Sequence, residues 1–247
     1  MSMSSRAVIL SACLLMANLS EAGQIPDKFT NLKVLPADAS RAEVVRVMRG
    51  FASALGVRCN HCHVGENPAN LDNYDFAADT KAPKRAARAM MQMTREINER
   101  LIPAAGLDRP IQVQCITCHR GLSKPEQLVD MLMRRAEQTG PAAALQEYQD
   151  LRKRHYGRSS YDFGAPTLNM LAEWLSGPRK NVAAAIEVQE FNVKVNPDIA
   201  SSYSFLGDLY IAKGDRAAAR VSFEKALALE PSNEYFKKRL SEFKQEK

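Results

Sequence analysis

Apolar side chains recur every three or four residues along most of the chain, and this spacing predicts α-helices. The first clear helical face carries Val44, Met48, Phe51 and Leu55. We expect this helix to begin at the capping-box sequence Ser40-Arg41-Ala42-Glu43 and to end at Gly56. Because similar patterns continue towards the C-terminus, the predicted fold class is all-α.

A second helix is expected from about residue 82 to residue 101. Its apolar stripe consists of Ala86, Met90, Met93, Ile97 and Leu101. Met91 points off that stripe. A loop containing Pro and Gly follows this helix and leads to Cys115.

The chain from about residue 125 onward consists of consecutive amphipathic helices that repeat. Pro197 and Pro231 are 34 residues apart, which is the period of the tetratricopeptide repeat. Residues 200–233 carry nearly every signature position of that repeat, namely Tyr203, Leu206, Gly207, Tyr210, Gly214, Ala219, Phe223, Ala226 and Pro231.

Two further helix pairs are predicted before this repeat. Residues 166–199 match the repeat more weakly, with Glu173 where a small Gly is expected, and residues 126–156 form a pair split at Gly140-Pro141. Stacking is needed because one helical hairpin cannot bury both of its faces. The stack is interpreted as a docking surface for another protein, and the alternative is that it only stabilises the N-terminal domain.

The N-terminus has the pattern of a secretory signal. Arg6 precedes an apolar run over residues 7–17, and cleavage is expected after Ala22. The run is too short to span a membrane as a helix. An alternative is a lipoprotein signal in which Cys13 is lipidated and tethers the chain to a membrane.

Composition limits the classes of function. The chain has 247 residues, of which 45% are hydrophobic and 25% charged, as in ordinary globular proteins. A net charge of +6 is too small for a dedicated nucleic-acid binder, so no nucleic-acid partner is expected. The predicted organisation is a signal peptide over residues 1–22, a first domain over 23–124 and a repeat domain over 125–247.

The four cysteines beyond the leader form two identical motifs. They read Cys59-Asn60-His61-Cys62-His63 and Cys115-Ile116-Thr117-Cys118-His119, and both fit C-x-x-C-H, the attachment signature of c-type haem. Two thiols at this spacing can each form a thioether to one porphyrin, and the adjacent imidazole can bind the iron. Two covalently bound haem c groups are therefore predicted.

Two other uses of these cysteines were weighed. One is a structural zinc site made of Cys59, Cys62, Cys115 and Cys118, and the other is a pair of redox-active dithiols. Neither explains why a histidine directly follows each pair. Export agrees with haem, because bacterial haem attachment takes place outside the cytoplasm.

Each iron also needs a ligand opposite its histidine. Met48 lies on the apolar face of the helix that runs into the first motif, whereas Met90 and Met93 are nearly equal candidates for the second. The alternative is that these are ordinary core methionines.

Residues 25–123 resemble the haem-binding cytochrome subunit of photosynthetic reaction centres and its shorter relatives. The resemblance rests on both C-x-x-C-H motifs, on Val47-Met48-Arg49-Gly50-Phe51 and on Ala89-Met90-Met91-Gln92-Met93-Thr94-Arg95-Glu96-Ile97-Asn98. In that family a helix before each motif supplies an axial methionine. The resemblance implies Met48 with His63 on the first iron and Met93 with His119 on the second. The full subunit has four such motifs, so this chain looks like one half of that architecture.

The leading hypothesis is an exported, periplasmic or extracytoplasmic dihaem cytochrome c that relays single electrons between redox partner proteins, without catalysing a reaction. Its repeats would dock a partner. One alternative is a dihaem peroxidase or reductase with one open iron. Another is a subunit that self-associates through its repeats into a haem-lined filament.

Overall fold

The computed structural model describes residues 25–67 and 70–243. The predicted leader, including Cys13, lies outside these residues. The described part of the chain is helical and contains no β-strand, only an isolated antiparallel bridge between Val64 and Asp75. The structure therefore confirms the all-α fold class.

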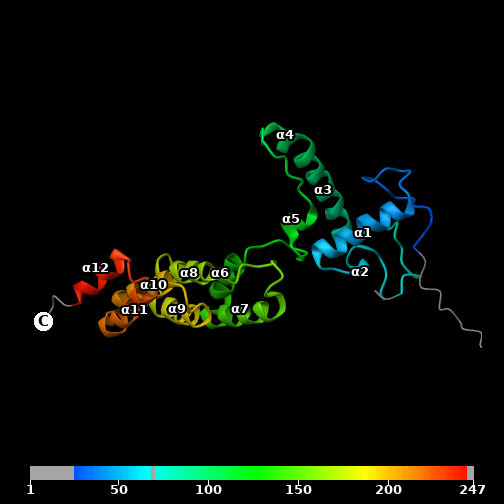
Figure 1. Ribbon diagram of the computed structural model, residues 1–247. Helices are drawn as coiled ribbons and strands as arrows, with labels where there is room; N and C mark the ends of the chain where they lie inside the picture. Colours follow the sequence, from blue (N-terminus) through cyan, green and yellow to red (C-terminus); the bar gives the residue numbers. More distant parts are fainter. Residues whose placement is uncertain (1–24, 68–69, 244–247) are drawn as a thin grey trace, which may run out of the picture. The chain divides into compact units, whose positions relative to one another are not determined.

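The chain divides into two compact units, which are described separately (Figure 1). The first comprises the chain up to Arg49 together with Arg58–Ile111. The second comprises Gly50–Val57 together with Gln112–Lys247. Helix α1 (Arg41–Leu55) contributes residues to both.

Helix α1 begins and ends where the sequence predicted. The Ser40 N–H donates to Oε2 of Glu43 at 2.8 Å, and the Glu43 N–H donates to Oγ of Ser40 at 3.3 Å. This reciprocal pair satisfies amide donors that a helix start otherwise leaves free. Gly56 follows the last turn with φ +66°, a left-handed conformation that favours glycine.

The second predicted helix is also present, but it changes its winding. Helix α3 covers Ala82–Glu96, with a proline in its first turn, and continues as a π-helical turn, η1 (Ile97–Leu101), and a short α4 (Ile102–Ala104). The apolar pattern of this helix does not predict the π-turn. Pro103 lacks the N–H that would bond the Glu99 carbonyl, which disfavours regular α-winding at this end.

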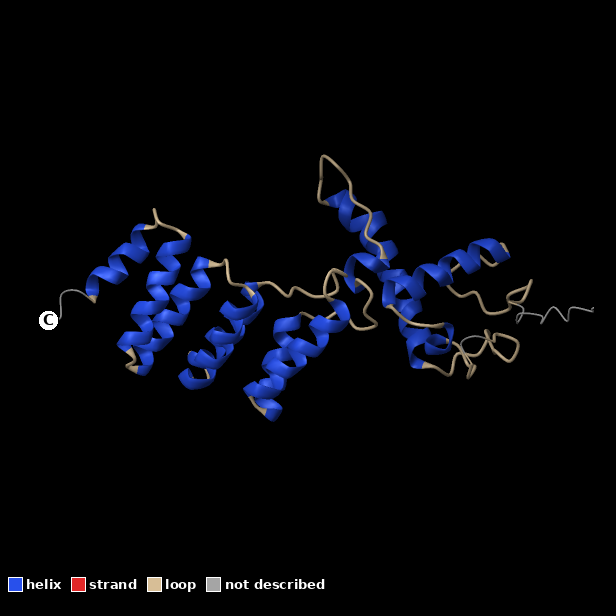
Figure 2. Cartoon of the chain, turned by 60° about the horizontal axis from the view of Figure 1, so that its bottom comes forward, coloured by secondary structure: helices blue, strands red, loops and turns tan. Residues whose placement is uncertain are grey.

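The second unit is a succession of helix pairs. After the short α5 (Cys115–His119), the helices are α6 (Leu128–Thr139), α7 (Pro141–His155), α8 (Ala165–Ser176), α9 (Val182–Val195), α10 (Ala200–Lys213), α11 (Arg216–Leu229) and α12 (Glu234–Glu242). Helices α6 and α7, α8 and α9, and α10 and α11 pack as pairs, and each pair lies beside the next (Figure 2). The predicted break at Gly140-Pro141 separates α6 from α7, with Gly140 at φ +95°.

One hydrophobic core runs through α6 to α10. Its fully buried members include Leu132, Tyr148, Leu168, Leu171 and Val188. In the last pair, Gly207 lies against the ring of Phe223, and a Cβ atom at Gly207 would come within 2.7 Å of that ring. This contact explains why the repeat signature requires a glycine there.

The α8–α9 pair departs from the repeat inside its core. Asn169, Gln189 and Asn192 precede Tyr203, Phe223 and Ala226 by one 34-residue period. Gln189 and Asn192 are completely buried, and Asn169 Oδ1 accepts hydrogen bonds from Gln189 Nε2 (2.8 Å), Asn192 Nδ2 (2.7 Å) and Ser202 Oγ (3.2 Å). We call Asn169, Gln189, Asn192 and Ser202 the amide network. It satisfies polar groups that would otherwise be buried without partners.

Candidate functional site

The first cysteine motif forms a single helical turn. Helix α2 (Cys59–Cys62) carries the pair, and the His63 N–H donates to the Cys59 carbonyl at 2.9 Å. Residues three apart lie on the same side of a helix, so the two thiols share one side. Both are free thiols; Cys59 is exposed and Cys62 is half-buried, which raises the pKa of Cys62.

The ring of His63 lies in an aromatic environment. Its edge packs against Phe76 with ring centroids 5.1 Å apart, and Tyr74 stacks on Phe76 at 5.4 Å. Burial lowers the pKa of His63, with a further contribution from nearby cations, so the imidazole is neutral at pH 7. A neutral imidazole is the form that binds iron.

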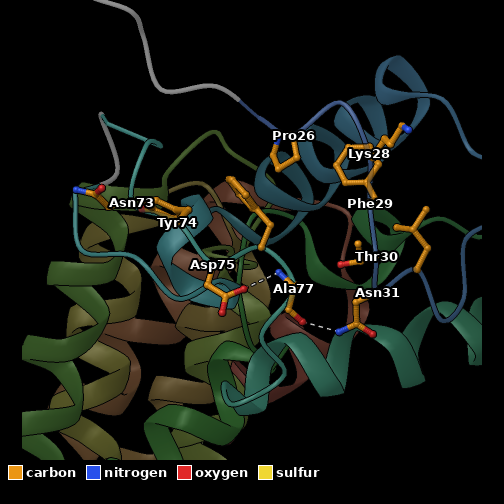
Figure 3. A pocket seen from close by; sticks show the side chains of 11 residues that line it. Pro26, Lys28, Phe29, Thr30, Asn31, Asn73, Tyr74, Asp75 and Ala77 are labelled. Carbon is orange, nitrogen blue, oxygen red and sulfur yellow. Dashed lines mark hydrogen bonds between the residues drawn. The ribbon is translucent and has the colours of Figure 1, made fainter.

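The loop that carries Phe76 is fixed from two sides. The Val64–Asp75 bridge joins it to the chain just after His63. On the other side, a cavity of about 500 Å³ lies between residues 26–32 and 73–77 (Figure 3). Across it, Asn31 Nδ2 donates to the Ala77 carbonyl at 2.5 Å (Figure 3). The N-terminal segment therefore helps to hold the aromatic wall beside His63.

A cluster of charges follows Phe76. Lys84 is 9% exposed, and its Nζ donates to the carbonyls of Phe76 (2.9 Å), Ala77 (3.0 Å) and Ala78 (2.7 Å). The Asp79 carboxylate pairs with Lys84 at 3.2 Å, and also with Arg88 and Lys33. Hydrogen bonds from Arg88 and Lys33 hold the pKa of Asp79 far below its usual range. We call Lys33, Asp79, Lys84 and Arg88 the Asp79 cluster.

The second motif has the same local form with a better-defined start. Helix α5 carries Cys115 and Cys118, and Gln114 caps it by donating its N–H to Oγ1 of Thr117 at 3.0 Å. Cys115 is half-buried and Cys118 is exposed, and both are free thiols. The two thiols again lie three residues apart on one helical side.

His119 is oriented by its own backbone. Its Nδ1 lies 2.8 Å from the carbonyl oxygen of Leu122. A carbonyl only accepts hydrogen bonds, so Nδ1 must carry the proton and Nε2 keeps its lone pair. The ring is thus preset for Nε2 to bind a metal.

The turn after the second motif is tightly packed within the second unit. Arg120 adopts a left-handed conformation with φ +48°, and its carbonyl accepts a hydrogen bond from Ser160 Oγ at 2.7 Å. The next amide, Gly121 N–H, donates to the carbonyl of Ala54 at 2.9 Å. The last turn of α1 is therefore bonded to the segment that ends the second motif.

The candidate axial methionines lie on α1 and α3. Met48 is half-buried, whereas Met90 and Met93 are 45% and 47% exposed. Met91 is half-buried. The interpretation of Met90 and Met93 as ordinary core residues does not fit this exposure.

These residues fit a c-type haem at each motif. Each motif pairs two free thiols on one helical side with a histidine that has an available ring nitrogen.

Among residues 25–67 and 70–243 there is no group of three or more His, Cys, Asp or Glu side chains that could hold a metal ion. Within the same ranges, no helix is long and apolar enough to cross a membrane.

Sequence reasoning missed several groups around the site. The Leu122 carbonyl is a backbone group, so no pattern of side chains predicts its hydrogen bond with His119. Phe76 lies near His63 on a loop without periodicity. Lys84 lies in the first turn of α3, where nothing in the sequence distinguishes this buried cation from the exposed Arg85 beside it.

Comparisons with known proteins agree with this geometry. Residues 9–198 match the family described as the photosynthetic reaction centre cytochrome C subunit, and residues 200–233 match a tetratricopeptide repeat. Cytochrome c-554 of Chloroflexus aurantiacus is 37% identical over 90 residues, which are 36% of this chain and 20% of that protein. The photosynthetic reaction center cytochrome c subunit of Roseobacter denitrificans is 33% identical over 104 residues, covering 41% of this chain and 26% of that protein.

Another similar protein is not a cytochrome by its name. The Hsp70-Hsp90 organizing protein of Triticum aestivum is 43% identical over 60 residues, which are 24% of this chain and 10% of that protein. The chain thus spans less than a third of the length of each of these relatives. The family match nevertheless covers most of the chain. The chain belongs to the photosynthetic reaction centre cytochrome c subunit family and also contains a tetratricopeptide repeat.

Proposed function

We propose that this chain is an exported cytochrome with two haem c groups that passes single electrons between redox partner proteins. The observation that carries the proposal is the repeated geometry of the two motifs. In each, two free thiols lie on one side of a short helix, and a histidine with an available nitrogen follows directly. Export is supported by the signal pattern of the leader.

For the first haem, we assign thioethers to Cys59 and Cys62 and iron ligation to His63 and Met48. The low pKa of His63 keeps its imidazole neutral for ligation. Phe76 and Tyr74 supply an apolar wall beside the ring, which excludes water from the histidine. Met48 follows from the resemblance and from its place on α1.

For the second haem, we assign thioethers to Cys115 and Cys118 and iron ligation to His119 and Met93. The Leu122 carbonyl fixes the His119 tautomer. Met93 follows from the resemblance and from its exposure on α3, and Met90 remains the second candidate because it is similarly exposed.

Electron relay makes modest chemical demands on the protein. Bound haem iron supplies the chemistry by alternating between its ferric and ferrous forms. The polypeptide must hold the ligands, exclude water and tune the reduction potentials. A methionine opposite histidine favours the ferrous state relative to two histidines.

The helical repeats are proposed to dock a protein partner, either a redox partner or a second copy of the chain. The support is the match of residues 200–233 to the tetratricopeptide repeat, together with the similarity of part of the chain to the Hsp70-Hsp90 organizing protein. Sedimentation of the purified protein at several concentrations separates the two partners. A species whose mass rises with concentration indicates self-association.

The proposed function is tested on full-length protein isolated from its native envelope. Intact mass spectrometry reports haem number, leader removal and acylation of Cys13 together, and a pyridine haemochrome assay counts the haems independently. We expect two haems per chain and a low-spin spectrum for both. A count other than two, or a high-spin haem that binds added ligands, contradicts the proposal; the second result indicates an enzyme.

A further inference from the structure

The two iron-binding histidines of the proposed function have different hydrogen bonds. His119 donates from Nδ1 to the Leu122 carbonyl at 2.8 Å. Among the residues that the structure describes, His63 Nδ1 is buried and makes no hydrogen bond of normal geometry, although the Phe76 backbone lies near enough to raise the pKa of the ring slightly. A donated hydrogen bond makes an imidazole a more basic ligand, and a more basic ligand favours ferric iron. This difference lowers the potential at the second motif relative to the first.

Charge acts in the same direction at the first motif. The Phe76 ring touches His63, and the Phe76 carbonyl accepts from the buried ammonium of Lys84 at 2.9 Å. The Asp79 cluster holds three cations around one carboxylate. Lys81, which donates to the Asn60 carbonyl within α2, adds another cation nearby. The net positive charge disfavours the extra charge of ferric iron and raises the potential.

The cation next to the second motif is screened by solvent more strongly than the cations near the first motif. Arg120 follows His119 directly, but it is exposed, so water and salt screen its guanidinium. Lys84, by contrast, is buried, and Arg88 is only 17% exposed at its side chain. A buried charge acts on a nearby site more strongly than an exposed one.

We propose that the haem at Cys59, Cys62 and His63 has the higher reduction potential, and that Lys84 and Arg88 are the residues that raise it. This haem is then the first of the two to be reduced. This inference rests on the proposed function, since it requires two haems.

The test uses redox titration of the full-length holoprotein, followed by visible absorbance, in three variants of the Asp79 cluster. Lys84→Met and Arg88→Gln each remove a positive charge, and Asp79→Asn removes the negative one. We expect the first two to lower the upper midpoint and Asp79→Asn to raise it. Each shift should be roughly tenfold in the reduction equilibrium, about 59 mV for one electron.

Opposite signs separate charge from damage, because a loosened fold would move all three variants in one direction. The control is Arg100→Gln, which removes a cation from the same continuous helix about 24 Å along its axis from Lys84. Arg100→Gln should leave the upper midpoint in place. If Lys84→Met fails to accumulate as holoprotein, Arg88→Gln and Asp79→Asn still decide the question.

The inference is overturned if the lower midpoint moves instead of the upper, if all variants shift in the same direction, or if the wild type shows one unresolved midpoint. A pyridine haemochrome count on each sample separates this failure from that of the proposed function. If the count is two haems and the lower midpoint shifts, only the proposed order of the two reduction potentials is rejected. A different count rejects the function itself.

Discussion

The carbonyl oxygen of Gly121 occupies the space that a Cβ atom at Gly56 would need. Two features of the chain meet here. Gly56 ends α1 with φ +66°, and the Gly121 amide bonds to the Ala54 carbonyl of the same last turn. The glycine at 56 is therefore needed both for its backbone conformation and for the close approach of the segment after the second motif.

Gly56→Ala should lower the free energy of unfolding by about 2 kcal/mol or more, because it adds a steric clash to the strain of a left-handed residue. Gly106→Ala is the matched control, since Gly106 has φ +63° and no atom within 4 Å of its Cβ position. The control should cost only about 1 kcal/mol. Guanidinium denaturation of the two variants measures the difference, and equal losses would show that the Gly121 contact is unimportant.

Removal of an axial methionine should change the spin state of one haem. Under the proposed ligation, Met48→Ala and Met93→Ala each take a sulfur ligand from one of two irons, so half of the haem is expected to become high-spin and to bind added ligands. Visible and EPR spectra of the oxidised protein measure this change.

Met90→Ala is the control for Met93→Ala, because the two side chains are 45% and 47% exposed on the same helix. Its spectrum should match that of the wild type. A spectrum altered by Met90→Ala and not by Met93→Ala would move the assignment to Met90.

The amide network should be sensitive to the loss of its shared acceptor. Asn169→Ala leaves the Ser202 hydroxyl without its acceptor and takes one acceptor each from Gln189 Nε2 and Asn192 Nδ2, so we expect a loss of about 2–3 kcal/mol in the free energy of unfolding. Asn196→Ala is a milder comparison, because this half-buried side chain donates one bond to Asn192 at 2.9 Å. Its expected loss is about 1 kcal/mol.

A combined variant tests whether the polar groups or the shape of the site matter. Asn169→Tyr, Glu173→Gly, Gln189→Phe and Asn192→Ala together install the side chains that occupy the equivalent positions in residues 200–233, including the glycine that leaves room for the Phe ring. Replacing the partners of a buried network with groups that pack well is often nearly neutral. We expect this combined variant to be more stable than Asn169→Ala alone, as measured by thermal unfolding. A lower stability would show that the site cannot accept the apolar set.

Alkaline pH should destabilise the last repeat through Tyr210. Burial and a hydrogen bond to Glu190 raise the pKa of Tyr210 to about 12. An unfolded tyrosine titrates near 10, so the folded state retains its proton longer. The associated stability is fully present below about pH 10 and is lost as the pH rises towards 12.

The free energy of unfolding of Tyr210→Phe should therefore fall less between pH 10 and pH 12 than that of the wild type. Tyr156→Phe, at a side chain that is 65% exposed, serves as the comparison and should follow the wild type. Urea denaturation at a series of pH values measures both slopes. Identical slopes for wild type and Tyr210→Phe would contradict the prediction.

Much of the helical architecture follows from local signals. The Ser40–Glu43 capping box, the stop at Gly56 and the break at Gly140-Pro141 are set by nearby residues, and each is where the pattern places it. The repeat over residues 200–233 can also be predicted from the sequence, because the Gly207–Phe223 contact lies within a single 34-residue repeat.

Other features depend on partners that are distant in sequence or on backbone atoms. The π-turn at Ile97–Leu101 is a change of winding inside an unbroken apolar pattern. The amide network occupies positions where the repeat predicts apolar residues. Its hydrogen bonds form only when α8, α9 and α10 pack together, so the sequence alone does not predict them. Similarly, the surroundings of His63 come from a loop whose residues carry no helical periodicity.

The spacing of Cys59 and Cys62 within a single turn has a consequence for the biogenesis of the protein. Sulfur atoms placed close enough to reach two neighbouring vinyl groups are also close enough to oxidise with each other. Outside the cytoplasm, such oxidation is favoured. Under the proposed export and haem attachment, porphyrin ligation would compete with dithiol oxidation, and the newly translocated polypeptide would require a supply of reductant until its prosthetic groups are attached.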